Sequence, residues 1–317
     1  MIPSLVLAPM AELSHRALRE LIESFAVKEG GLAGVTYFTE MINAATYVSG
    51  GAFEQWYDDN GPYPEKLVYQ VVGGKADDII RAVELLDRRE CLGIDINMGC
   101  SAPAITRIGA GVRWMTDIDK AGALIRGTRA KTRRRLSVKL RTGLSDDFDY
   151  LVRFCRRLED EGIDVITLHG RTAKEKFKRR ARWNYVSALK KELRIPLIGN
   201  GDIGSIEEIE RRGKECDAVM IGRLALRRPW IFAEIQQAVS PGFVPAIEET
   251  GIQFLDLLSK YQPPEFHLSR ARRFFHYFCD NLKWGTYVKN LINREQDLRG
   301  IARAWKEYFE TPGAFTK

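Results

Sequence analysis

The run Gly93-Ile94-Asp95-Ile96-Asn97-Met98-Gly99-Cys100 decides the fold of this chain. A short run rich in apolar residues and bounded by glycines is typical of a buried strand in a parallel sheet. Cys100 therefore lies on a loop at the carboxyl end of that strand, where α/β folds place their chemistry. A cysteine is more often a small buried apolar residue. Here Asn97 and the neighbouring glycines favour a functional loop.

Seven further runs of this kind alternate with stretches of helical periodicity. Besides the strand before Cys100, strands are predicted at residues 5–7, 35–38, 67–72, 136–140, 165–168, 196–198 and 218–221. Helices are predicted at 14–27, with Ser14 as the N-cap, and at 79–86, 117–129 and 147–161. Eight strand–helix units in about 235 residues predict an α/β fold, a closed (β/α)8 TIM barrel. An open doubly wound sheet is the alternative.

The pattern changes after residue 240. Pro241, Gly242 and Pro245 indicate a linker, and only helical stretches follow, at 252–261, 269–282, 288–292 and 298–309. Aromatic residues in and beside these stretches supply the core of a small bundle, and a minority are expected to face outward. We predict a TIM-barrel catalytic domain at 1–240 and a small all-helical domain at 241–317.

The composition is that of a soluble globular protein, with 45% hydrophobic and 29% charged residues among 317. No run approaches the ~20 apolar residues that span a bilayer, and the N-terminus lacks a signal pattern. The five cysteines are odd in number and no two have metal-ligand spacing, which predicts free thiols and no metal site. We expect a cytoplasmic monomer that does not bind membranes.

The net charge of +7 is concentrated in four clusters. They lie at 129–135, 174–182, 223–228 and 270–273. Any single cluster is as compatible with a solvated surface as with a binding site. Clusters in successive loops of one fold favour a face that binds a polyanion.

Polar residues and glycines at the strand ends predict a flavin site. Asn200-Gly201-Asp202 and Gly222-Arg223 follow strands seven and eight, where barrels bind phosphate through backbone N–H groups. The Gln70 amide suits a ring edge with donor and acceptor atoms. Lys139 would place a cation beside a ring that gains negative charge on reduction. We therefore predict bound FMN.

The strand-end motifs together resemble the tRNA-dihydrouridine synthase family, in family order and across the whole barrel. The matching motifs are Leu7-Ala8-Pro9-Met10, Thr39-Glu40-Met41, Gln70-Val71-Val72-Gly73, Asp95-Ile96-Asn97-Met98-Gly99-Cys100, Val138-Lys139-Leu140-Arg141, His169-Gly170-Arg171-Thr172, Gly199-Asn200-Gly201-Asp202-Ile203, Ile221-Gly222-Arg223 and Arg228-Pro229-Trp230-Ile231-Phe232.

The resemblance implies FMN-dependent reduction of the C5–C6 bond of uridine in tRNA, with NADPH or NADH as electron donor. It assigns Cys100 as the catalytic acid that protonates C5. Asn97 and Arg171 are the candidates for holding the uracil, and 241–317 becomes a tRNA-binding domain. The implied cofactor-binding residues are Ala8, Pro9, Met10, Gln70, Lys139, His169, Asn200, Gly201, Asp202, Gly222 and Arg223.

Two features depart from the family pattern. Ser101 stands where the family usually has proline after the active cysteine, so the φ restriction of proline is lost. The stretch before Trp183 is more basic than usual. Two alternatives remain open, a dihydroorotate-dehydrogenase-like flavin enzyme acting on a small molecule, and an RNA-binding protein on an inactive barrel.

Overall fold

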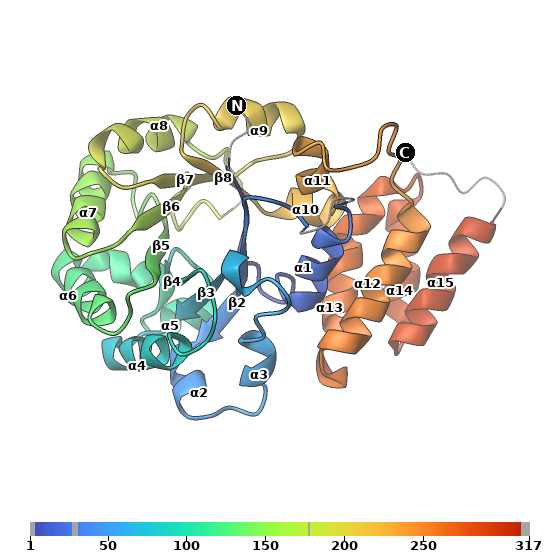
Figure 1. Ribbon diagram of the computed structural model, residues 1–317, viewed down its shortest axis with the longest axis horizontal. Helices are drawn as coiled ribbons and strands as arrows, with labels where there is room; N and C mark the ends of the chain where they lie inside the picture. The colour runs from blue at the N-terminus through green and yellow to red at the C-terminus, as the bar shows by residue number, and fades with distance from the viewer. Residues whose placement is uncertain (1–3, 27–30, 177, 312–317) are drawn as a thin grey trace. The chain divides into compact units, whose positions relative to one another are not determined.

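A computed structural model describes residues 4–26, 31–176 and 178–311, and within these its sheet is a closed barrel of eight parallel strands. Each strand pairs with the next along the chain, and β1 pairs with β8 to close the sheet (Figure 1). The strands are β1 Ser4–Leu7, β2 Val35–Asn43, β3 Leu67–Val72, β4 Gly93–Met98, β5 Arg135–Arg141, β6 Val165–His169, β7 Leu197–Asn200 and β8 Ala218–Ile221. The predicted TIM barrel is confirmed.

Helices connect the strands of the barrel. The longer ones begin at aspartate or serine N-caps where the sequence supplies them, as Asp117 and Asp147 do by accepting from the backbone N–H three residues later. The connecting helices are α2 Ala44–Val48, α3 Glu54–Tyr57, α4 Ala76–Leu86, α5 Pro103–Arg107, α6 Ile118–Arg129, α7 Phe148–Asp160, α8 Trp183–Glu192 and α9 Ile206–Arg212, with 3-10 turns at Pro64–Lys66 and Gly111–Thr116.

The pairing register places polar residues of neighbouring strands side by side. Gln70 of β3 is level with Asp95 of β4, and Asp95 is level with Ser137 of β5. One layer nearer the carboxyl ends, Asn97 is level with Lys139. Since side chains alternate across a strand, residues two apart share one face, so these two layers are stacked on the same side of the sheet.

The second compact unit combines the two ends of the chain. Contacts within the chain group Met1–Pro9 with Gly34–Ile221, and group Met10–Ala33 with Gly222–Lys317. The units are interleaved along the chain, whereas the sequence predicts a single boundary at residue 240. The second unit contains α1 Arg16–Glu23, α10 Arg223–Arg227, α11 Ile231–Ile235, α12 Ile247–Tyr261, α13 Pro264–Phe278, α14 Gly285–Arg294 and α15 Leu298–Glu310, with a 3-10 turn at Cys279–Asn281.

Aromatic side chains form the core of the second unit. Phe254 of α12 stacks on Phe274 of α13 with ring centroids 3.7 Å apart, and Phe275 lies 4.8 Å from the ring of Trp305. Trp305 of α15 is fully buried, and its indole N–H donates to the carbonyl of Glu248 at 2.9 Å. Trp284 and Tyr287 are exceptions, with 55% and 60% of each residue exposed.

Local boundaries differ from the sequence prediction at two places. Ser14 is not the N-cap of α1; His15 holds that position, because the Ser14 hydroxyl bonds the backbone of Met10 instead. Strand β2 continues to Asn43 through a register shift between Phe38 and Met41, so it is longer than predicted. The helix predicted at 14–27 ends earlier than expected, at Glu23 with Ser24 as its C-cap, and only residue 27 of the predicted range lies outside the described residues.

Candidate active site

The interior of the barrel is polar near the carboxyl ends of the strands. The Lys139 ammonium on β5 donates to Oδ1 of Asn200 on β7 at 3.2 Å. Because β6 lies between these strands, the bond crosses the inside of the barrel. The Asn200 amide is completed by a bond from its Nδ2 to the carbonyl of Met220 at 2.9 Å. The bond to Met220 therefore fixes the Asn200 side chain, so that its Oδ1 holds the Lys139 ammonium in place.

The Lys139 ammonium is buried, and its surroundings disfavour the charged form. Burial, with a smaller contribution from the neighbouring Arg141 guanidinium, lowers the pKa of Lys139 to about 8, while Asp95 and Cys100 oppose the shift. The Asn200 bond is the one hydrogen bond that the Lys139 side chain makes with described residues. The ammonium therefore has donor capacity left for an electron-rich group.

Cys100 differs from the other cysteines in its exposure. Cys91, Cys155, Cys216 and Cys279 are free and buried, whereas Cys100 is free and partly exposed. Its loop is held on both sides. The Cys100 N–H donates to Oδ1 of Asn97 at 2.9 Å, and the Arg141 guanidinium donates to the carbonyl of Gly99 at 3.0 Å. The thiol is thus presented from a fixed turn rather than from a loose loop.

Asn97 and Gln70 are joined in a buried chain of hydrogen bonds. Nδ2 of Asn97 donates to Oε1 of Gln70 at 2.9 Å, and Nε2 of Gln70 donates to Oδ2 of Asp95 at 2.7 Å. Ser137 donates to the other carboxylate oxygen of Asp95 at 2.7 Å. Sequence reasoning missed Asp95 and Ser137 as site residues, although a carboxylate between two isoleucines of a buried strand was a visible signal.

His169 and Arg171 lie together where β6 ends. The Arg171 guanidinium lies 3.1 Å from Nε2 of His169 and donates two bonds to the Asp202 carboxylate at 2.6 and 2.7 Å. It also donates to the carbonyl of Arg179 at 2.5 Å. Gly201 has a φ of +121°, and a Cβ there would lie 2.7 Å from Ala181 and 3.0 Å from the His169 ring. These contacts require glycine at 201.

A strongly basic loop follows Arg171 in the chain. We call it the basic loop and define it by its exposed cations, Lys174, Lys176, Lys178, Arg179 and Arg180. The base of the loop is fixed by Glu175, which accepts two bonds of 2.6 Å from Arg182. Those bonds hold the pKa of Glu175 down at about 2. The loop is therefore anchored while its cations point to solvent.

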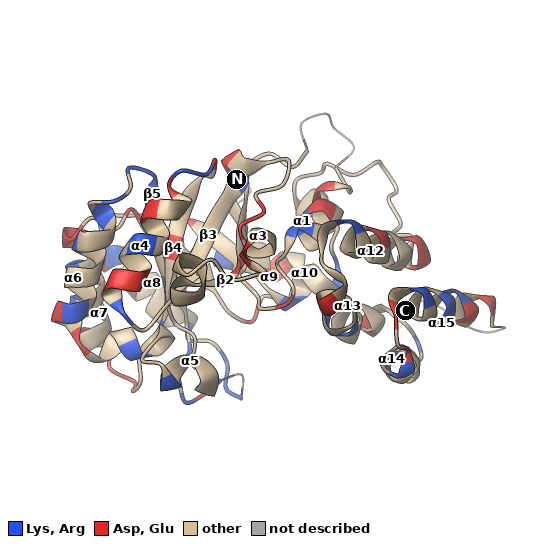
Figure 2. Ribbon diagram, turned by 90° about the horizontal axis from the view of Figure 1, so that it is seen from below, with Lys and Arg blue, Asp and Glu red and all other residues tan. Residues whose placement is uncertain are grey.

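The 129–135 cluster lies at the other end of the barrel from the basic loop. It precedes β5, whereas the basic loop follows β6, and all strands are parallel. Arg129 pairs with Asp164 at 2.9 Å and Lys131 with Glu84 at 3.3 Å. Acidic and basic ribbon segments are interspersed on the neighbouring α6 and α7 (Figure 2). The expectation that all clusters form one face is wrong for these two.

The basic clusters at 223–228 and 270–273 lie in the second unit, and most of their arginines bond to residues of that unit. Arg227 pairs with Asp280 at 3.0 Å and Arg228 with Glu234 at 2.8 Å. Arg270 is buried and bonds Gln262, and Arg273 pairs with Glu12. These arginines therefore have partners within the second unit.

The remaining predicted cofactor residues are divided between the two units. In the first, the Ala8 N–H donates to the carbonyl of Ile221 at 2.8 Å, and Pro9 is half-buried beside it. In the second, the Met10 N–H donates to the Ser14 hydroxyl at 2.9 Å. Gly222 there precedes α10, and Arg223 begins that helix with an exposed side chain.

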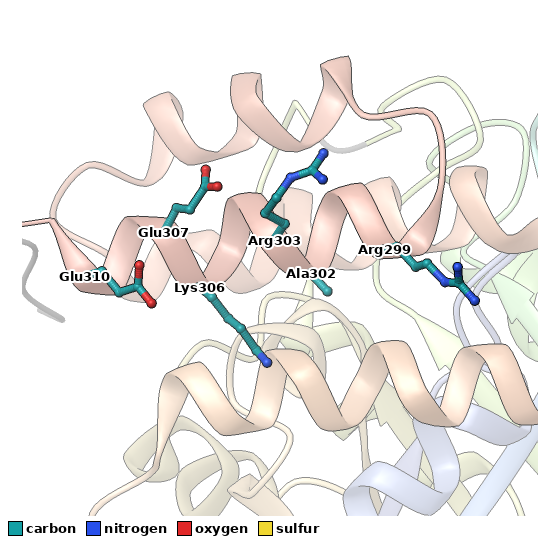
Figure 3. A pocket seen from close by; sticks show the side chains of 6 residues that line it. All are labelled: Arg299, Ala302, Arg303, Lys306, Glu307 and Glu310. Carbon is teal, nitrogen blue, oxygen red and sulfur yellow. The ribbon is translucent and has the colours of Figure 1, made fainter.

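A hollow along α15 is unlike this site. It is lined from one helix by side chains of both signs, Arg299, Ala302, Arg303, Lys306, Glu307 and Glu310 (Figure 3). Among the described residues no three His, Cys, Asp or Glu side chains are grouped to hold a metal. Over the same part of the chain no helix has the length and apolar character to cross a membrane.

The fold and the strand-end residues define a TIM-barrel enzyme with its chemistry at the carboxyl ends of the strands. The family model described as "Dihydrouridine synthase (Dus)" matches residues 6–310. The chain belongs to this family of flavin oxidoreductases, which confirms the resemblance read from the motifs and decides against both alternatives.

Relatives match over most of the chain. A "Probable tRNA-dihydrouridine synthase" of Aquifex aeolicus is 33% identical over 248 residues, 73% of this chain and 72% of the relative. The "tRNA-dihydrouridine synthase B" of Pectobacterium carotovorum is 28% identical, covering 96% of each. The solved structure of histamine dehydrogenase from Rhizobium sp. 4-9 matches with a TM-score of 0.54 at 10% identity. That match covers 80% of this chain and 49% of the dehydrogenase, and it concerns the fold alone.

Proposed function

We propose that the protein reduces uridine in tRNA to dihydrouridine with FMN as cofactor and NADPH, or NADH, as the source of electrons. The observation that carries this proposal is geometric: Lys139, a buried cation with donors to spare, is level with Asn97 on the neighbouring strand, and Asn97 fixes the turn that presents the partly exposed Cys100. The proposal takes the protein to act as a cytoplasmic monomer.

The residues present fit an FMN ring and its phosphate. Lys139 has N–H donors that no described residue uses, which suits a ring that becomes more electron-rich on reduction. Gln70 is fully buried, and its amide retains one N–H and one lone pair beyond its bonds to Asp95 and Asn97. Gly201 allows backbone to approach a phosphate closely, with His169 beside it. Ala8, Pro9, Met10, Asn200, Asp202, Gly222 and Arg223 complete the proposed cofactor set.

The reaction adds a hydride and a proton across the C5–C6 double bond. When bound, reduced FMN supplies the hydride to C6. Cys100 gives its thiol proton to C5 from the opposite face, as a general acid. Lys139 attracts the thiolate left behind, because the charges of Lys139 and Cys100 interact favourably. The thiolate then recovers its proton from solvent, which the partial exposure of Cys100 allows.

Asn97 is proposed to hold the uracil with what remains of its amide. Its Oδ1 already accepts from the N–H groups of Gly99 and Cys100, at 3.1 and 2.9 Å. One N–H of Nδ2 is left for a carbonyl oxygen of the base. Arg171 is fully engaged with Asp202, His169 and the basic loop, so its contribution to substrate binding is proposed to come through the position of that loop.

A uridine within folded tRNA must leave its stack to reach a barrel mouth. The basic loop follows β6 and so stands at the carboxyl end of the barrel, with its cations in solvent. We propose that it grips the phosphate backbone while the base is extruded. The unit that contains α12–α15 is proposed to bind the rest of the tRNA.

Cys100→Ala tests this proposal directly. The purified variant should keep the absorption near ~450 nm of oxidised flavin and its bleaching by NADPH. It should lose dihydrouridine formation by about 10²–10⁴-fold, the usual contribution of a general acid. Cys91→Ala, which removes a buried thiol, is the matched control. A protein that cannot bind FMN, or a Cys100→Ala variant with normal activity, would contradict the proposal.

A further inference from the structure

We propose that Asp95 is a positioning residue for Cys100, which it orients through the side chains of Gln70 and Asn97. The catalytic consequence rests on the proposed function, whereas the orientation rests on the hydrogen bonds alone. All four residues lie in the first compact unit, on β3, β4 and the loop that follows β4.

The direction of the chain of hydrogen bonds is fixed from the Cys100 end. Backbone N–H groups can only donate, so the side-chain atom of Asn97 that faces Gly99 and Cys100 must be the carbonyl oxygen. The NH2 group of Asn97 therefore faces Gln70, at 2.9 Å, and must meet its oxygen. That leaves the NH2 group of Gln70 facing Asp95 at 2.7 Å.

The same direction is fixed independently from the Asp95 end. An ionised carboxylate can only accept, so it selects the NH2 side of the Gln70 amide. Ser137 saturates the other oxygen of Asp95 by donating to it at 2.7 Å. The register supports this arrangement, since Gln70, Asp95 and Ser137 are level on three neighbouring strands. Two flippable amides are thus locked between a pure acceptor at one end and two pure donors at the other.

A buried carboxylate lowers the stability of a barrel interior, because its charge is removed from water. Branched apolar residues usually occupy such positions. Burial raises the pKa of Asp95 to about 6, although the bonds from Ser137 and Gln70 oppose the shift. A group that costs the fold free energy and ends a chain of bonds at the catalytic cysteine is better explained by orientation than by packing.

The chain offers variants that separate polarity from charge. Asp95→Asn can keep a carbonyl oxygen towards Gln70 and turn its NH2 group towards Ser137, whose hydroxyl can also accept. It should preserve the orientation of Gln70 and Asn97. Asp95→Val is close in size but offers no acceptor, so the Gln70 amide is free to turn. Asp95→Ala serves the same purpose if the valine variant does not fold. Thr128→Val, which removes a buried hydrogen bond within α6, is the control for lost stability.

Two readouts on the purified holoenzyme test the proposal. Amide hydrogen exchange of the segment 97–102 reports the Cys100 N–H bond without any turnover. Asp95→Val should speed this exchange by about tenfold, the expected effect of losing one buried hydrogen bond. The kcat of dihydrouridine formation should fall by about 10–100-fold, with the KM for tRNA within about twofold, because a misplaced acid harms chemistry more than binding. Asp95→Asn should match the wild type in both.

The proposal is overturned if Asp95→Val behaves like the wild type. It is also overturned if Asp95→Asn loses as much activity as Asp95→Val, or if Thr128→Val accelerates exchange at 97–102 to the same extent. Failure of the proposed function looks different. If the wild type makes no dihydrouridine while Asp95→Val alone speeds exchange at 97–102, the assigned reaction is wrong and the orientation of Cys100 by Asp95 stands.

Discussion

Replacing Lys139 by methionine should stabilise the flavin-free protein. The same change should abolish dihydrouridine formation by the FMN-loaded protein. The two side chains are similar in length, and methionine carries no charge into the barrel. Burial lowers the pKa of Lys139 from 10.5 to about 8, so the ammonium is disfavoured in the folded state. Each pKa unit corresponds to about 1.4 kcal/mol, which gives a cost to folding of about 3 kcal/mol at pH 7.

The net gain is smaller because the variant also loses a bond. Removing the donor to Asn200 costs about 1 kcal/mol, so Lys139→Met should raise the free energy of unfolding by about 2 kcal/mol at pH 7. The gain should shrink with rising pH. Between the folded pKa of about 8 and the unfolded value of 10.5, the unfolded state holds the extra proton, so the wild type becomes more stable. At pH 9.5 the remaining cost is about 1.5 kcal/mol, and the two proteins should be nearly equal.

Urea denaturation of the flavin-free proteins at pH 7 and pH 9.5 measures this difference. Lys174→Met on the exposed basic loop is the control, and should change stability by less than about 0.5 kcal/mol at either pH. A Lys139→Met variant that is destabilised at pH 7 would refute the reasoning. So would a stabilisation that is the same at both pH values, because the pKa of Lys139 would then not be its source.

Three further predictions concern tRNA binding by the basic loop, the close contacts at Gly201 and the aromatic core of the second unit. Replacing the five cations of the basic loop with glutamine should weaken tRNA binding and reduce the log–log salt slope by roughly 0.7–0.9 per lost phosphate contact; neutralising the exposed cations of 129–135 should leave filter-binding affinity unchanged. Gly201→Ala should lower the free energy of unfolding by about 1–3 kcal/mol, because strain and a clash combine, whereas Gly50→Ala, with φ +73° and open space, suffers strain alone; thermal melts compare them. Trp305→Ala should cost about 3–5 kcal/mol in urea denaturation, against little for Trp284→Ala, and equal losses would contradict the assigned core.

The barrel could be predicted because its strands follow local rules. Residues 218–221 are a continuous apolar run, residues 67–72 are apolar apart from Gln70, and the structure gives strands with those bounds. The extension of β2 beyond Phe38 could not be predicted so easily. It contains the polar residues Thr39 and Glu40, whose burial depends on neighbours distant in sequence, and a register shift that no local pattern reveals.

The site residues could be predicted only as a set, without their partners. Their positions at strand ends were visible in the sequence, and so was the family pattern. The bond between Arg171 and Asp202 joins residues 31 apart, and the bond between Gln70 and Asp95 joins residues 25 apart. Such pairings depend on strand order and register, which composition and spacing do not contain. The opposite placement of 129–135 and the basic loop was accessible, since one precedes a strand and the other follows one.

The second unit is assembled from the beginning and the end of the chain, and this has a consequence for biosynthesis. Helix α1 packs on α12, which is synthesised more than 200 residues later. Its apolar side chains, Leu18, Leu21 and Ile22 among them, must wait for that partner while the whole barrel emerges from the ribosome. A nascent chain stopped before residue 247 therefore lacks the helix that provides most of the contacts of α1, and the apolar face of α1 stays largely uncovered until α12 is made.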